Sequence, residues 1–401
     1  MGRVGSMIVF LLVVVGILAG LHVYVWLRLV RDTQLPPPWS GLALAGLVLL
    51  GLAIPVSLFY GRSHPELRRF LSWPAYVWLG MVFILFLTVL GMDVVKGGIH
   101  VVQRLRGGGP SDPARRTWLA RVLGAAAVAL SGALGLGAVQ SALGPVAVRK
   151  VRVRLPRLPS AQDGLSIVQL TDMHVGATRG RAFVEDVVAR ANALQPDVVA
   201  ITGDLVDGSV ADLRHAIEAL RDLRARHGVY FVTGNHEYYS GASAWIAELG
   251  RIGIRVLRNE RVTIGEGDAA FDLAGVDDYS AGRFSGLAHD DAVAKALGGR
   301  DPNREVVLLA HQPRSIIAAE KFGVGLQLSG HTHGGQIWPF TYFVHLQQPF
   351  VAGLHRTGES QIYVSRGTGY WGPPMRLGAP AEITQIVLES ETPAVARTAA
   401  G

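Results

Sequence analysis

The chain has 401 residues, no cysteine and a formal net charge of +7, and its charge is unevenly distributed. Residues 1–157 hold 17 Lys and Arg against 4 Asp and Glu, whereas residues 158–401 hold 21 against 27, so the two parts carry +13 and −6. The acidic second part argues against a nuclease that binds duplex nucleic acid, and the absence of cysteine neither requires nor excludes an oxidising compartment.

Four long apolar stretches in residues 1–145 predict a transmembrane region of four helices. They run over Met7–Leu29, Trp39–Tyr60, Trp73–Val95 and Trp118–Leu143. Each exceeds the ~20 residues that span a bilayer as a helix. Tyr24 and Trp26 stand where a signal peptide would have small residues, so the first stretch is expected to be an uncleaved anchor. Few ionisable residues lie in these stretches, which favours an anchor or lipid-facing platform over a transporter.

Basic residues beside the apolar stretches predict the orientation. The loop from Lys96 to Arg116 carries five Lys or Arg, and the positive-inside rule places it in the cytoplasm. With four spans, the C-terminal domain then lies on the extracytoplasmic face. The basic cluster from Arg149 to Arg157 argues for the reverse orientation, but part of it alternates with Val as a strand does. We therefore expect a multi-pass protein of the cell membrane with its second domain outside.

Strand and helix patterns alternate through a second predicted domain, residues 146–390, and residues 391–401 are expected to form a disordered tail. Strands are predicted at Ser166–Leu170, Val198–Thr202, Val229–Thr233, Arg255–Leu257, Asp272–Val276, Val306–Ala310, Leu326–Ser329, Gln361–Val364 and Thr384–Leu388. Helices are predicted at Arg181–Leu194, Ala211–Arg226, Ala242–Arg251, Asp290–Leu297 and Ser315–Phe322. This order predicts an α/β domain with two packed sheets flanked by helices.

Five short polar motifs follow the apolar runs of this domain. They are Asp172-Met-His174, Gly203-Asp204, Gly234-Asn235-His236-Glu237, Ala310-His311 and Gly330-His331-Thr-His333. Residues i and i+2 of an extended segment point to the same side, so Asp172 and His174 can hold one ion together. The same holds for His331 and His333. The spacings from His174 to Asp204 and on to Asn235 are 30 and 31 residues, the length of a strand, a crossover helix and a strand.

Parallel strands of that kind place their carboxyl ends along one sheet edge, where ligands bind. Carboxylate, imidazole and amide ligands without thiolate suit Mn, Fe, Zn or similar divalent ions. Two such ions ~3.5–4 Å apart activate a water and clamp a phosphoryl oxygen. A single histidine in an apolar context has roughly even odds of being structural. Five motifs in register with five strand ends leave little room for a packing explanation, so a two-metal site is predicted.

The motifs resemble those of the calcineurin-like metallophosphoesterase superfamily over roughly residues 150–390. The D-x-H, G-D-x-x-D, G-N-H-E, H and G-H-x-H blocks stand here as Asp172 to His174, Gly203 to Asp207, Gly234 to Glu237, His311 and Gly330 to His333. Gly330 to Gln336, Ser365 to Gly369, Gly372 to Pro374 and Arg376 to Gly378 are similar to a bacterial membrane-associated branch. That branch resembles UDP-2,3-diacylglucosamine pyrophosphatases. The resemblance implies a four-layer αββα sandwich.

The resemblance also implies a role for each site residue. The first metal would be held by Asp172, His174 and His333, and the second by Asn235, His311 and His331, with Asp204 bridging the two. His236 would not ligate a metal, but would stabilise the phosphoryl transition state and protonate the leaving oxygen. Asp207 has two open interpretations, a hydrogen bond to a ligand histidine or a cap on the following helix.

The predicted function is that of a membrane-anchored dinuclear metal-dependent hydrolase of phosphate ester or pyrophosphate bonds. Its expected partners are a small or lipid-linked phosphorylated substrate and the lipid bilayer, with no nucleic acid. The alternatives are another phosphodiesterase or a protein phosphatase. A catalytically inactive scaffold is disfavoured because all seven ligands and His236 are present.

The apolar segment Ile337–Val351 follows the last histidine pair directly. Its aromatic residues are Trp338, Phe340, Tyr342, Phe343 and Phe350. Such a segment can admit acyl chains or touch a bilayer if it is exposed, or it can cover the sheet. Because aromatic clusters are most often packing, covering the sheet is the favoured interpretation.

Overall fold

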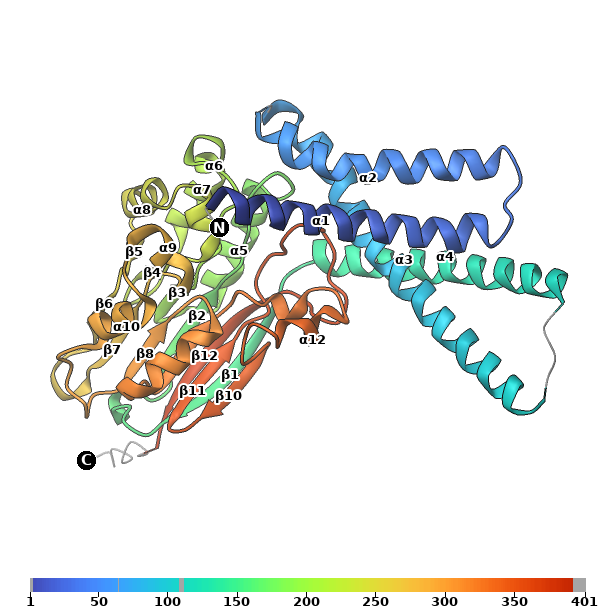
Figure 1. The fold of residues 1–401 in the computed structure, drawn as a ribbon. Helices are drawn as coiled ribbons and strands as arrows, with labels where there is room; N and C mark the ends of the chain where they lie inside the picture. Colours follow the sequence, from blue (N-terminus) through green and yellow to red (C-terminus); the bar gives the residue numbers. More distant parts are fainter. Residues whose placement is uncertain (1–2, 64, 108–111, 392–401) are drawn as a thin grey trace. The chain divides into compact units, whose positions relative to one another are not determined.

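The computed structural model describes residues 3–63, 65–107 and 112–391 and divides the chain into two compact units (Figure 1). The first unit holds residues 1–140 together with 372–375, and the second holds 141–371 together with 376–401. The domain boundary predicted between residues 145 and 146 remains a prediction. Apart from Glu391, the predicted tail lies outside the described residues.

The first unit consists of helices that correspond to the four predicted apolar stretches. They are α1 (Arg3–Trp26), which continues into a π-helical turn (Leu27–Arg31), α2 (Trp39–Ser63), α3 (Pro65–Leu105) and α4 (Pro113–Leu143). All four are long and apolar enough to cross a membrane. Asp93 is paired with Arg28 at 2.7 Å and accepts a hydrogen bond from the Tyr24 hydroxyl at 2.6 Å. The Asp93 carboxylate is therefore paired with a cation and a hydroxyl within the first unit.

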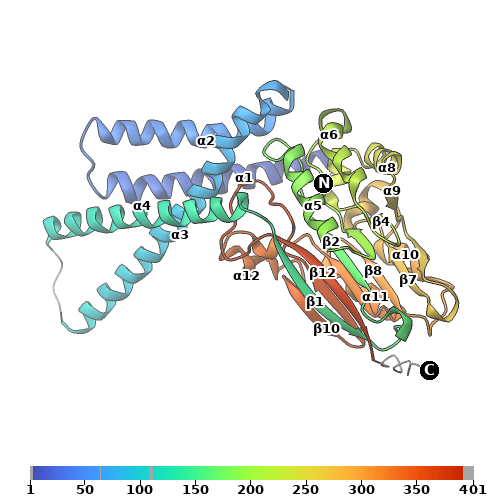
Figure 2. The ribbon, with the colours of Figure 1, turned by 180° about the vertical axis from the view of Figure 1, so that it is seen from behind.

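The second unit is built on two six-stranded sheets. The first sheet has the order β1 (Ala147–Leu155), β12 (Glu382–Ser390), β2 (Ser166–Leu170), β3 (Val198–Ile201), β4 (Val229–Phe231), β5 (Arg255–Val256). The second has the order β10 (Gly353–Thr357), β11 (Ser360–Val364), β9 (Leu326–Ser329), β8 (Val306–Leu309), β7 (Phe271–Gly275), β6 (Glu260–Ile264). Figure 2 shows β1 beside β12, with which it pairs in parallel.

Three apolar cores hold the layers together. Between the sheets, Ile167 and Val198 of the first sheet share a fully buried cluster with Leu273 and Leu326 of the second. The helices α5 (Arg181–Ala193), α6 (Val210–Ile217) and α8 (Ala242–Arg251) contribute to a second core with the other face of the first sheet. The helices α10 (His289–Leu297) and α11 (Ile316–Ala319) contribute to a third with the second sheet. The predicted four-layer αββα sandwich is therefore confirmed.

Several predicted elements differ from those observed. The helix predicted over Ala211–Arg226 is α-helical only to Ile217 and continues as a 3-10 turn over Glu218–Asp222. Leu220 and Leu223 remain buried in this segment. Tighter 3-10 turns of this kind are frequent at the ends of α-helices. The helix predicted over Ser315–Phe322 is likewise α-helical only over Ile316–Ala319, with 3-10 turns on both sides.

The sequence patterns also missed several short or edge elements. They did not predict β6, β10 or the short helices α7 (Asn235–Ser240), α9 (Gly282–Ser285) and α12 (Phe340–Val344). The alternation of Arg with Val near residue 150 belongs to β1, an edge strand whose Arg152 side chain is exposed and donates to Glu389. This alternation is therefore a property of the sheet.

Candidate metal centre

Every predicted ligand follows the carboxyl end of a strand. Asp172 and His174 follow β2, Asp204 follows β3 and Asn235 follows β4, while His311 follows β8 and His331 and His333 follow β9. Because β2, β3 and β4 are parallel, their carboxyl ends meet at one edge of the first sheet. The second sheet is joined to that edge by the backbone N–H of His331, which donates to both carboxylate oxygens of Asp172 at 3.0 Å.

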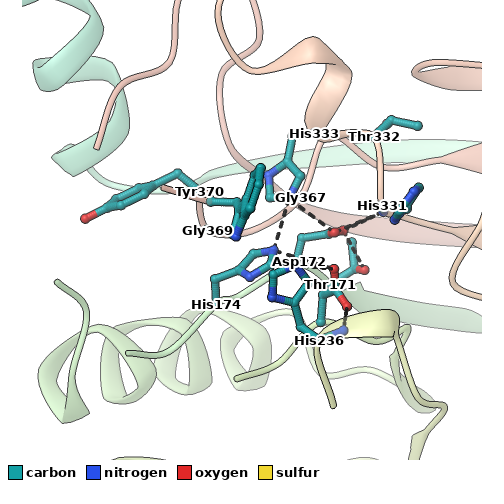
Figure 3. A network of polar contacts seen from close by, with 12 residues as sticks. Thr171, Asp172, His174, His236, His331, Thr332, His333, Gly367, Gly369 and Tyr370 are labelled. Atoms are coloured by element: carbon teal, nitrogen blue, oxygen red, sulfur yellow. Dashed lines mark hydrogen bonds and ion pairs between the residues drawn. The ribbon is translucent and has the colours of Figure 1, made fainter. Parts of the chain in front are cut away.

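One cluster consists of Asp172, His174 and His333, which are all buried. Their potential ligand atoms lie within 4.8 Å of one another. The Nε2 atoms of His174 and His333 are 3.1 Å apart, and His333 Nε2 is 3.4 Å from Asp172 Oδ1. Figure 3 shows these side chains turned toward one another. Two imidazole nitrogens and a carboxylate oxygen therefore converge on one small space.

A second cluster consists of Asp204, His311 and His331. His311 Nε2 lies 3.1 Å from Asp204 Oδ2 and 3.2 Å from His331 Nδ1. Asp204 Oδ2 also lies 3.7 Å from His174 Nε2 of the first cluster. The Asp204 carboxylate therefore lies between the two clusters.

The donor atoms of both clusters fit divalent metal ions. The Oδ1 atom of Asn235 is buried and has no hydrogen-bond partner among the described residues. A buried amide oxygen without a partner is suited to bind a cation. Burial lowers the pKa of His331 to about 3 and holds the pKa of His333 well below its usual value. Both imidazoles therefore stay neutral and keep a lone pair for a metal. The set of nitrogen and oxygen donors without sulfur suits Mn, Fe or Zn.

The backbone of the site is held in a conformation that side chains rarely adopt. Of the nine non-glycine residues with positive φ in the described part of the chain, five are predicted ligands: Asp172, His174, Asp204, His331 and His333, with φ between 46° and 70°. Such residues cost about 1–3 kcal/mol each and cluster at functional sites. A Cβ atom on Gly330 would collide with Thr171 Oγ1 and Asp172 Oδ2, so the close approach of the two loops requires glycine there.

Asp207 joins a predicted ligand to the predicted catalytic histidine. Its Oδ1 accepts from Nδ1 of His174 at 3.1 Å and from Nδ1 of His236 at 2.6 Å. The N-cap of α6 is Ser209, whose side chain accepts from the Asp212 N–H. Of the two interpretations left open by the sequence, the structure therefore shows the hydrogen bond and not the helix cap.

His236 lies beside both clusters, and nearby carboxylates stabilise its protonated form. Burial alone would lower its pKa, but the negative charge of Asp204 and the hydrogen bond to Asp207 outweigh burial and raise the pKa to about 9. Its Nε2 atom is 4.0 Å from Asp204 Oδ2. The rings of Tyr239 and Trp371 meet the imidazole edge to face, with centroids 5.4 and 5.6 Å away.

Two buried residues that support the site had no role assigned from the sequence. Glu237 accepts hydrogen bonds from the backbone N–H groups of Gly234, Asp204 and Leu205 at 2.6, 3.0 and 2.8 Å. It therefore fixes the loop after β3 against the loop after β4. The position of Glu237 directly after Asn235 and His236 in the motif was the feature of the sequence that could have indicated this supporting role.

Arg376 supports the loop that carries His333. Its guanidinium is 1% exposed and donates to the carbonyls of His333, Arg366, Gly369 and Ala379, and it lies 3.3 Å from His333 Nδ1. Burial lowers the pKa of this arginine to about 9. The motif Arg376-Leu-Gly378 contributed to the family resemblance, but no local pattern connects it with His333.

Two clusters of His and Asp at the joined edges of an αββα sandwich define the class of protein as a metal-binding phosphoesterase fold. Comparisons with known proteins agree. Residues 165–335 match the calcineurin-like phosphoesterase family. The chain is 37% identical over 388 residues to a transmembrane protein with metallophosphoesterase domain from Bos taurus, covering 92% of this chain and 86% of that protein. It is 32% identical over 390 residues to an uncharacterized metallophosphoesterase of Campylobacter jejuni, covering 96% and 99%.

The chain therefore belongs to the calcineurin-like metallophosphoesterase family. Family membership supports a phosphoester hydrolase that uses divalent metals. The bovine relative is likewise named as a transmembrane protein that carries a metallophosphoesterase domain. These relatives are named for the family and not for a substrate, so they give no support to the resemblance to UDP-2,3-diacylglucosamine pyrophosphatases.

Proposed function

We propose that this protein is a membrane-anchored phosphoesterase with a dinuclear metal centre, which hydrolyses phosphate ester or pyrophosphate bonds. The main support is the arrangement of two ligand clusters on either side of one carboxylate. In this proposal, Asp172, His174 and His333 would hold one ion, Asn235, His311 and His331 would hold the other, and the Asp204 carboxylate would contribute to both. When bound, two such ions supply an activated water and stabilise charge on the phosphoryl oxygens.

In this proposal His236 is the general acid. The Asp207 carboxylate accepts the Nδ1 proton of His236, which leaves the Nε2 proton available on the side of Asp204. With a pKa raised to about 9, the imidazole is protonated at neutral pH. It can therefore give its Nε2 proton to the oxygen that leaves the phosphorus atom, and the remaining neutral imidazole stays oriented by Asp207.

We further propose that the substrate is lipid-linked. Four helices long enough to span a bilayer keep the catalytic unit at a membrane, where a lipid substrate is concentrated. We also propose that the catalytic unit lies on the extracytoplasmic face, because the segment from Lys96 to Arg116 carries five Lys or Arg. The structure has most of this segment, predicted as a loop, in the end of α3 and the start of α4.

The metal assignment is tested with Asp204→Asn in the full chain, reconstituted in phospholipid nanodiscs. Loss of one bridging oxygen should reduce both the metal content, measured by plasma mass spectrometry, and the turnover of phosphomonoester, phosphodiester and pyrophosphate-linked lipid substrates. The exposed Asp268→Asn is the matched control and should change neither. Two retained ions with near-normal turnover in Asp204→Asn would show that the bridging role is wrong.

The orientation is tested separately, and the lack of native cysteine makes the experiment simple. Single cysteines are placed at the exposed Asp268 of the catalytic unit and at the exposed Gln103 near the C-terminal end of α3. A membrane-impermeant maleimide should label intact cells at position 268, and should label position 103 only after permeabilisation. The opposite pattern would place the catalytic unit in the cytoplasm.

A further inference from the structure

The segment after His333 presents large apolar side chains to the outside of the catalytic unit. Trp338, Tyr342 and Leu346 are 55%, 67% and 82% exposed, and Phe340 and Phe343 are also exposed. The residues of α12 are all exposed or half-buried. The expectation that this segment covers the sheet is therefore wrong for these five side chains, although Phe350 does pack against the core of the second sheet.

The outward display is imposed by contacts that fix the segment at both ends. Ile337 is buried, and the N–H of Trp338 donates to the carbonyl of Leu377 at 2.9 Å. The hydroxyl of Thr341 donates to the carbonyl of Gly334 at 3.0 Å, which turns the Thr341 side of α12 toward the site loop. At the other end, the buried Gln348 bonds with the side chain of Gln312, next to His311. The exposed aromatic residues therefore lie on a well-anchored helix.

The exposed surface continues from α12 to the catalytic histidine. The Gln336 side chain donates to the carbonyl of Trp371 at 2.8 Å and accepts from its N–H at 2.9 Å, which holds Trp371 beside the start of the segment. Trp371 is 56% exposed, and its ring contacts His236. We define the aromatic surface as Trp338, Phe340, Tyr342, Phe343, Leu346 and Trp371.

The chemistry of this surface fits the boundary between lipid headgroups and acyl chains. Residues 331–355 and 367–371 contain no Asp, Glu, Lys or Arg, in a domain that is otherwise rich in charge. Trp and Tyr concentrate at this boundary because their rings are apolar and carry one polar group. Exposed apolar surfaces of this kind mark interaction sites. The same chain carries four helices long and apolar enough to span a membrane, so a bilayer is always nearby.

We propose that the aromatic surface inserts into the interfacial layer of the bilayer to which the chain is anchored. The catalytic unit then has a second, independent membrane contact, and the Trp371 ring that contacts His236 lies at the lipid surface. This proposal goes beyond the catalytic assignment and does not depend on which bond is hydrolysed.

The test uses the full chain with single cysteines at Tyr342 or Leu346, each carrying a nitroxide spin label, in phospholipid nanodiscs. Ile317→Cys is the matched control, because Ile317 is an apolar residue of the same unit that is 62% exposed outside the aromatic surface. Power saturation compares collisions with oxygen, which dissolves in lipid, and with a water-soluble nickel chelate. Labels at 342 and 346 should collide several-fold more often with oxygen than the label at 317, and less often with nickel. Metal content should be unchanged in all three.

Nickel accessibility at 342 and 346 equal to that at 317 would overturn the proposal. Protection from both reagents, with dipolar broadening that disappears when labelled chains are diluted with unlabelled ones, would also overturn it, because the surface would then contact a second copy. As a second measurement, Phe343→Ser in the Leu346-labelled chain should reduce oxygen collisions at 346, because it removes an adjacent inserted side chain.

Discussion

The hydrogen bond from His236 to Asp207 allows a quantitative test of the catalytic arrangement. Asp207→Asn keeps the size of the side chain and an oxygen that can accept from Nδ1 of both His236 and His174, but it removes the negative charge. The change should therefore weaken the preference for a protonated His236 without removing the side chain that orients it. The Asp207→Asn variant therefore separates the effect of the negative charge of Asp207 from the effect of the hydrogen bond that orients His236.

The size of the effect follows from the geometry. The 2.6 Å contact is a charge-assisted hydrogen bond, worth about 1.5–3 kcal/mol, whereas a neutral one is worth about 0.5–1.5 kcal/mol. The carboxylate of Asp207 is 28% exposed, so the lower part of the range applies and the loss is about 1–1.5 kcal/mol. One pKa unit and one factor of ten in rate each correspond to about 1.4 kcal/mol. The pKa of His236 should therefore fall by about one unit. At neutral pH kcat should fall by less than tenfold, because most of the imidazole is still protonated there.

The assay is a pH profile of kcat for a phosphodiester with an alkoxide leaving group. The carboxylates raise the pKa of His236, so protonated enzyme is lost as pH rises through that value, and removal of one carboxylate should move the alkaline limb of the profile to lower pH. Asp268→Asn, an exposed position, is the control and should leave the limb in place. An alkaline limb in Asp207→Asn at the wild-type pH would refute the general-acid role of His236 or its coupling to Asp207.

Three further predictions concern single residues and the metal ions. His236→Asn should keep both ions but lower kcat by roughly 10²–10⁴, with a smaller loss for nitrophenyl substrates, whose leaving group needs no proton; loss of metal instead would make His236 a ligand. Arg376→Met leaves four carbonyl groups without their buried hydrogen-bond donor, and each such group costs about 1–3 kcal/mol. The Tm of thermal unfolding should therefore fall clearly, and Arg376→Lys should recover part of the loss. An unchanged Tm would contradict this role of Arg376. Burial would lower the pKa of His311, but the charge of Asp204 outweighs burial and holds this pKa well above its usual value. Metal binding at pH 7 should therefore release a proton from His311. Calorimetry in buffers of different ionisation enthalpy measures this release, and His311→Gln should reduce it.

Local sequence patterns predicted the parts of the site that depend on strand ends. The bounds of β2 and β9 agree with prediction because each is a short run closed by polar motif residues, Thr171-Asp172 and Gly330-His331. Residues within the motifs lie near one another because parallel strands share an edge. The pairing of Asp207 with His174 and His236 was left open, because the same position also suits a helix cap and only the relative placement of two loops decides between them.

Sequence patterns failed where the answer depends on distant neighbours. Phe340 and Tyr342 are of a type that usually packs in a core, but the contacts that anchor α12, including that of Thr341, turn them outward. Arg376 lies 43 residues after His333, with no periodic pattern between them, so its contact with the ligand loop is visible only in three dimensions. The 3-10 end of α6 is a similar case, because the path to β4 and not helix propensity sets where the helix stops.

Both ligand clusters combine residues from the two sheets. Asp172 and His174 of the first sheet converge with His333 of the second, and Asp204 of the first converges with His311 and His331 of the second. Bound ions would therefore link the two sheets across their interface and stabilise the five residues with positive φ. Metal occupancy would then affect how firmly the two sheets are held together at this edge. Removal of the ions by a chelator should increase amide hydrogen exchange more in β2, β3, β8 and β9 than in β6, which lies at the far end of the second sheet.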